Sequence, residues 1–80
     1  MVEIRRFKFK PARLAVNKGD RISWINHDIA PHTATARDKS WDTGKLAKGQ
    51  KHTITVSQDM ELSYFCRYHP AMKGTLIAGN

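Results

Sequence analysis

Three side chains that bind soft metals lie within seven residues near the carboxyl end of the chain. They are the thiol of Cys66, the imidazole of His69 and the thioether of Met72, in the run CRYHPAM. Pro70 disfavours helical geometry at His69, and a strand-like pattern leads into Cys66, so we expect a tight loop that follows a strand. Three residues reach at most about 10 Å even when extended. Such a loop can therefore fold all three side chains around one point.

A fourth ligand has to come from elsewhere in the chain. His32 is the best candidate, because Pro31 fixes the approach of the chain and a short strand-like run begins there. The competitors are His52, which falls on a polar alternating strand and is expected to face solvent, and His27, which lies in a turn. Soft sulfur ligands favour Cu(I) and imidazoles favour Cu(II), so this mixed set suits copper and one-electron exchange. The predicted ligands are His32, Cys66, His69 and Met72.

The elements that must position these ligands are strands. Apolar residues recur mostly with a period of two, turn residues separate the runs, and helical spacing is never sustained for the length of an ordinary helix. We therefore expect an all-β fold, a small antiparallel sandwich or barrel of about seven short strands. A long polar connection covers residues 37–51. The strand-like segments cover residues 4–9, 12–16, 21–26, 32–36, 51–56, 60–66 and 74–78.

Length and composition indicate one small domain, residues 1–80, with a thin core that a bound metal would help to stabilise. A single cysteine excludes an internal disulfide. Fourteen Lys and Arg against seven Asp and Glu give a formal charge of +7. We do not expect a nucleic-acid partner, because the aromatic residues form no exposed, interleaved platform. No run is apolar enough to span a membrane, and we expect a monomer.

Four runs resemble the cupredoxins, most closely their amicyanin and plastocyanin-like branch. The resemblance implies a Greek-key β-sandwich with one type 1 copper ion at one end, held by His32, Cys66, His69 and an axial Met72. It implies a soluble carrier of single electrons rather than an enzyme, in a periplasmic or otherwise exported location. The runs are GDRISWIN at 19–26, PH at 31–32, WDTGKL at 41–46 and YFCRYHPAMKG at 64–74.

The resemblance also implies how the site is tied together and where electrons leave. Amicyanin-like proteins place Asn after the first histidine ligand, and here Thr33 stands in its place, so the tie is either weaker or supplied by the Thr33 hydroxyl and N–H. Electrons should leave through the exposed ring edge of His69. Arg67 and Lys73 would give that exit a basic rim, which favours redox partners with acidic docking surfaces.

A copper chaperone or storage protein of the periplasm is the alternative function. Transfer proteins usually offer two or three exposed soft ligands, whereas this set mixes two imidazoles with one thiolate inside a packed fold. Copper enzymes need further copper ions with additional histidines, and only His27 and His52 remain, at unrelated positions. A hydrolase built on Cys66 and His69 would lack an evident oxyanion hole.

Overall fold

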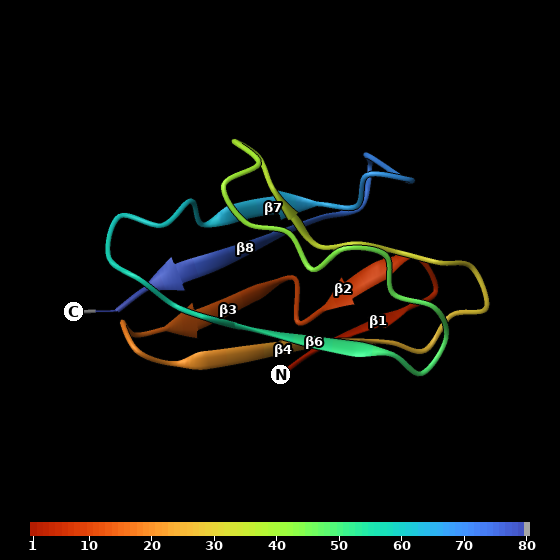
Figure 1. Ribbon diagram of the computed structural model, residues 1–80, viewed down its shortest axis with the longest axis horizontal. Helices are drawn as coiled ribbons and strands as arrows, with labels where there is room; N and C mark the ends of the chain where they lie inside the picture. Colours follow the sequence, from red (N-terminus) through yellow and green to blue (C-terminus); the bar gives the residue numbers. More distant parts are fainter. Residues whose placement is uncertain (80) are drawn as a thin grey trace.

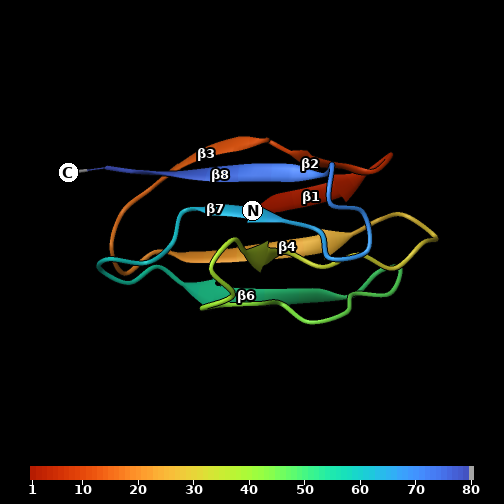
Figure 2. The same cartoon turned by 90° about the horizontal axis from the view of Figure 1, so that it is seen from above.

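The computed structural model describes residues 1–79, and within them the regular secondary structure is all β. Two four-stranded sheets face each other as a sandwich (Figures 1 and 2). The predicted all-β fold is confirmed and is consistent with a Greek-key sandwich. The eight strands are β1 (Val2–Arg5), β2 (Lys8–Lys10), β3 (Arg13–Val16), β4 (Arg21–Asn26), β5 (Thr35–Ala36), β6 (Lys51–Thr55), β7 (Ser63–Phe65) and β8 (Lys73–Ala78).

The sheets are mixed, so the expectation of a purely antiparallel arrangement is wrong. One sheet has the order β2-β1-β4-β6 and the other β3-β8-β7-β5. In the first, β1 runs parallel to β4, and in the second, β3 runs parallel to β8. Period-two patterning fixes which face of a strand is buried but does not fix its neighbour, which the connections across the sandwich decide.

The expected strand at residues 4–9 is in fact a hairpin. Strands β1 and β2 pair antiparallel, with Arg5 opposite Lys8, and Arg6 and Phe7 alone form the turn. Both turn residues have positive φ, 52° and 61°. Two-residue hairpin loops require this geometry, which Asn-Gly adopts easily and bulky side chains adopt at a cost of about 1–2 kcal/mol each. Because Arg-Phe carries no turn signal, the turn residues themselves did not indicate the break.

The core lies between the sheets and is rich in aromatic rings. Trp24 is fully buried, and its ring lies 5.4 Å from that of Tyr64 in an edge-to-face contact. Tyr64 and Cys66 are buried, and Met60 and Leu62 pack against the core cluster, so alternate residues of this segment face inward. Burial raises the pKa of Tyr64 to about 12. The ligand Cys66 is thus continuous with the packed interior.

Three connections meet at one end of the sandwich, opposite the carboxyl terminus (Figure 1). They are the β1–β2 turn, the loop after β4 and the loop between β7 and β8. The two loops carry the predicted ligands, and the turn carries Phe7. The β3–β4 turn lies at the other end of the molecule. No helix within residues 1–79 has the length and apolar character needed to cross a membrane.

Candidate metal centre

Residues 66–72, which we call the ligand loop, fold back on themselves as the sequence predicted. The N–H of Cys66 donates to the carbonyl of Met72 (3.1 Å), and the N–H of Met72 donates to the carbonyl of His69 (2.8 Å). A third bond runs from the N–H of His69 to the carbonyl of Cys66 (3.2 Å). These bonds close the loop at both ends. Cys66 and Met72 are buried, whereas His69 is half-buried.

His32 lies in the loop between β4 and β5 and approaches Cys66 from there. Its backbone is held by two hydrogen bonds with Leu46, of 3.1 Å and 2.8 Å, which form an isolated antiparallel bridge. The imidazole is fully buried, and its Nδ1 lies 3.7 Å from the Sγ of Cys66. His32 therefore lies beside the ligand loop although 34 residues separate it from Cys66.

The distance between these two donors fits a shared metal ion. An ion bound about 2.0 Å from an imidazole nitrogen and about 2.3 Å from a thiolate sulfur holds them roughly 3.7 Å apart at a trigonal angle. The His32 and His69 rings lie 5.2 Å apart between centroids, so the second imidazole is also near. Within residues 1–79, no three His, Cys, Asp or Glu side chains already form a metal cage. The full set of His32, Cys66, His69 and Met72 therefore stays a prediction.

The other two histidines lie outside this centre. His27 follows β4 directly and is paired through its Nε2 with Glu3 on β1 at 2.9 Å. His52 is exposed on β6, opposite Trp24, as the alternating pattern predicted. Neither approaches Cys66 in any contact of the described chain. Of the three candidates for the fourth ligand, the structure brings only His32 to the thiol.

Thr33 ties the two ligand-bearing loops together. Its N–H points at the Sγ of Cys66 (3.4 Å), and its hydroxyl accepts a hydrogen bond from the N–H of Arg67 (2.9 Å). Of the two alternatives that the sequence left open, a weaker tie or one made by Thr33, the contacts fit the second. The hydroxyl also contacts that of Thr35, which donates to Asp42 (2.9 Å and 3.0 Å). The Asp42 carboxylate pairs in turn with the Arg67 guanidinium at 3.2 Å, which closes a ring.

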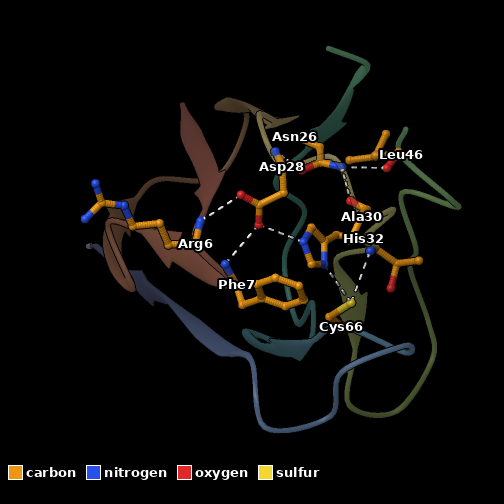
Figure 3. A network of polar contacts seen from close by, with 9 residues as sticks. Arg6, Phe7, Asn26, Asp28, Ala30, His32, Leu46 and Cys66 are labelled. Atoms are coloured by element: carbon orange, nitrogen blue, oxygen red, sulfur yellow. Dashed lines mark hydrogen bonds and ion pairs between the residues drawn. The ribbon is translucent and has the colours of Figure 1, made fainter. Parts of the chain in front are cut away.

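Asp28 holds His32 from behind, a contact that sequence reasoning missed (Figure 3). Its Oδ2 accepts a hydrogen bond from the Nε2 of His32 at 2.9 Å. Burial alone would raise the pKa of Asp28, but bonds from the N–H groups of Phe7 and Arg6 and from His32 outweigh it and lower the pKa. An ionised carboxylate can only accept, so Nε2 carries the proton. In the neutral ring, Nδ1 is then free to bind a metal beside Cys66.

The loop that presents Asp28 is itself ordered by Asn26. The buried Asn26 amide donates to the carbonyls of Ala30 (2.9 Å) and Leu46 (2.8 Å), and its Oδ1 accepts from the N–H of Asp28 (2.8 Å). The only signal in the sequence was the Asn-His-Asp turn before Pro31. That signal predicted a loop but did not reveal that its carboxylate reaches His32.

Phe7 is the second residue that sequence reasoning missed. Its ring makes edge-to-face contacts with both imidazoles, at 5.0 Å from His32 and 4.7 Å from His69. The turn is held over the site because Asp28 accepts hydrogen bonds from the N–H groups of Arg6 (2.8 Å) and Phe7 (2.9 Å). A signal was present, since Ile4 and Phe9 cannot face the same side of one continuous strand.

Comparison with known proteins agrees with this geometry. A family model described as a cupredoxin-like domain matches residues 1–78. Amicyanin from Paracoccus versutus is 24% identical over 82 residues, which cover 96% of this chain and 62% of the relative. Plastocyanin from Nostoc punctiforme is 29% identical over 86 residues, which cover 85% and 62%. The chain thus spans about three fifths of the length of the curated relatives it matches.

Solved structures give the same result. A reduced amicyanin variant superimposes with a TM-score of 0.83 at 26% identity, covering 98% of this chain and 79% of its own. A purple cupredoxin from Nitrosopumilus maritimus, at 18% identity, shares the fold with a TM-score of 0.88 over 98% and 97% of the two chains. A Cu-containing nitrite reductase from Thermus scotoductus matches this chain over only 22% of its own length. The chain belongs to the cupredoxin-like domain family.

Proposed function

We propose that the protein carries single electrons by means of one type 1 copper ion held by His32, Cys66, His69 and Met72. The observation that carries the proposal is the buried pair of His32 Nδ1 and Cys66 Sγ, 3.7 Å apart and backed by Asp28 and Thr33. Cupredoxins bind one type 1 copper ion, which supplies chemistry between Cu(II) and Cu(I). Amicyanin and plastocyanin, the curated relatives, are electron carriers rather than enzymes.

The protein's contribution is to hold the donors in one arrangement for both oxidation states. His32 is fixed by the Asp28 carboxylate, and the thiolate of Cys66 receives the N–H of Thr33. Such outer contacts orient the ligands and tune the potential of a bound metal. The packed surroundings of Cys66 and Met72 exclude water from that side. Little then needs to move when the electron leaves, which is the condition for fast transfer.

The route out of the site is the ring edge of His69. This residue is half-buried and lies with five neighbours around a surface depression, so a partner can approach it closely. The depression is lined by Phe7, Tyr68, His69, Pro70, Ala71 and Met72. The net charge of +7 favours acidic redox proteins as partners. Lys73 is exposed beside the loop, whereas the charge of Arg67 is partly balanced by Asp42.

We further infer that the protein works as a monomer in the periplasm or another exported compartment. Support comes from Cys66, a buried free thiol. Free thiols are unusual in oxidising compartments, and a metal bound to Cys66 would protect it there.

The test is the visible spectrum after one equivalent of Cu(II) is added to the purified protein. We expect an intense thiolate-to-copper charge-transfer band that is absent from Cys66→Ser, with both proteins equally folded by circular dichroism. A colourless wild-type protein that still binds copper would overturn the electron-carrier proposal. That result would favour the alternative of a copper chaperone or storage protein.

A further inference from the structure

We infer that the β1–β2 hairpin is the docking element through which an acidic redox partner reaches His69. The inference rests on the proposed function and deepens it. Phe7 stands at the tip of the hairpin with 47% of its surface exposed, while its ring lies 4.7 Å from that of His69. A partner that touches the His69 edge therefore also touches Phe7. The exposed Tyr68 borders the same depression.

The hairpin tip is fixed in place, and its residues are not those that a turn needs. Arg6 and Phe7 occupy the two positive-φ positions where Asn and Gly would fit without strain. The Asp28 carboxylate holds both of their N–H groups and the buried ring of His32 at once (Figure 3). Bulky side chains kept at a disfavoured turn point to a role outside folding. The position of Phe7 over the imidazoles is consistent with that role.

The positive charge of the hairpin is complementary to an acidic partner. Arg6 and Lys8 flank Phe7, so their Cα atoms lie about 3.8 Å from its Cα. Among the described residues, no carboxylate side chain forms an ion pair with Arg6, Lys8 or Lys10. By contrast, Arg67 on the ligand loop pairs with Asp42. The unpaired positive charge around the His69 depression therefore includes that of the hairpin as well as that of Lys73, and such charges act over the Debye length of about 8–10 Å.

The far end of the sandwich offers a matched control. Lys18 lies in the β3–β4 turn and Arg21 begins β4, both at the end opposite the metal centre (Figure 1). Both are exposed, and neither forms an ion pair within residues 1–79. The double variant Lys18→Gln/Arg21→Gln removes two positive charges, as Arg6→Gln/Lys8→Gln does, and leaves the hairpin unchanged.

The experiment uses the copper-loaded, reduced protein and two oxidants of opposite charge in stopped flow. One electron passes from Cu(I) to hexacyanoferrate(III) or to tris(phenanthroline)cobalt(III), which become the Fe(II) and Co(II) complexes. At about 0.01 M ionic strength we expect Arg6→Gln/Lys8→Gln to slow the reaction with the anion about fivefold and to speed that with the cation. Both effects should fade near 1 M salt. The far-end control should change either rate by less than about a third of its value.

A second measurement tests docking directly. Hexaglutamate titrated into the Cu(I) protein should shift the amide NMR signals of the hairpin and of residues 67–71, but not those of residues 17–21. Equal rate effects in the two double variants, or peptide shifts spread over the whole surface, would overturn the inference. So would hairpin-dependent binding to phosphatidylglycerol vesicles with unchanged oxidant kinetics, because the occupant would then be an anionic membrane. If the protein does not turn blue with Cu(II), that result contradicts the proposed function itself and not only the docking inference.

Discussion

The two histidines of the candidate copper site stand in opposite surroundings. His32 is fully buried, bridged to Leu46 through its backbone and bonded to Asp28 through its ring. His69 is half-buried in the ligand loop, and its ring makes aromatic contacts with Phe7 and His32 but no side-chain hydrogen bond within the described chain. One proposed ligand is built into the fold, and the other is accessible from the surface.

This difference separates two tasks that a small electron carrier must perform. A rigid ligand keeps the donor set unchanged between oxidation states, whereas an accessible ligand shortens the path to the partner. Asp28 connects the two histidines. Its carboxylate accepts a hydrogen bond from the ring of His32, and it also accepts one from the N–H of Phe7, whose ring contacts His69.

The largest difference is expected between His32→Ala and His69→Gly. Loss of the buried ring leaves a cavity and an unpaired Asp28, so the apoprotein should lose about 3–4 kcal/mol in free energy of unfolding. His69→Gly should cost less than about 1 kcal/mol, because the side chain lies at the surface. Urea unfolding followed by tryptophan fluorescence measures both. Added imidazole should restore the blue band only in His69→Gly, and equal losses of stability would contradict the comparison.

Asp28→Asn should weaken the hydrogen bond that orients His32 while keeping the imidazole in place. Because the amide is neutral and has one acceptor oxygen instead of two, the bond to His32 is weaker and at least one hairpin N–H loses its acceptor, at a cost of about 1–3 kcal/mol in unfolding free energy. Cu(II) affinity should fall about tenfold. If Cu(I) affinity is unchanged, the reduction potential rises by about 59 mV, which voltammetry measures. Asp38→Asn, on an exposed loop, is the control and should leave the potential as it is.

Thr33→Ala tests the tie between the two ligand-bearing loops. The partly buried Arg67 N–H loses its acceptor and the contact with Thr35 is lost, so the free energy of unfolding of the apoprotein should fall by about 1–2 kcal/mol. Amide hydrogen exchange at Arg67 should become faster. Thr33→Ser keeps the hydroxyl and should restore the slow exchange. Fast exchange in both variants would show that the hydroxyl does not hold the loop.

Arg6→Asn should have the smallest effect and the opposite sign. Asn tolerates the positive φ of 52° better than Arg, so the variant should be more stable by roughly 0.5 kcal/mol. Thermal unfolding of the apoprotein measures this gain, which amounts to a few degrees in a domain of this size. A loss of stability would mean that the Arg6 side chain has a structural role.

The proposed ligands and most of the strands could be named from the sequence. Cys66, His69 and Met72 are close in the chain, so their proximity follows from loop reach, and the parity of the strand before Cys66 places that side chain inward. Segments such as 21–26 appear as β4 with unchanged bounds. The split at Arg6 and Phe7 was missed because the turn is built from residues without turn propensity and is held by a contact 21–22 residues away.

Local pattern by itself therefore determined the ligand types, the all-β class and which faces are buried. Only the tertiary structure decided that β1 pairs parallel with β4, that Asp28 reaches both His32 and the hairpin tip, and that Phe7 covers the two imidazoles. The physical reason is range. Periodicity and spacing report on neighbours along the chain, whereas a single carboxylate that joins three segments is favourable only after the two sheets have packed.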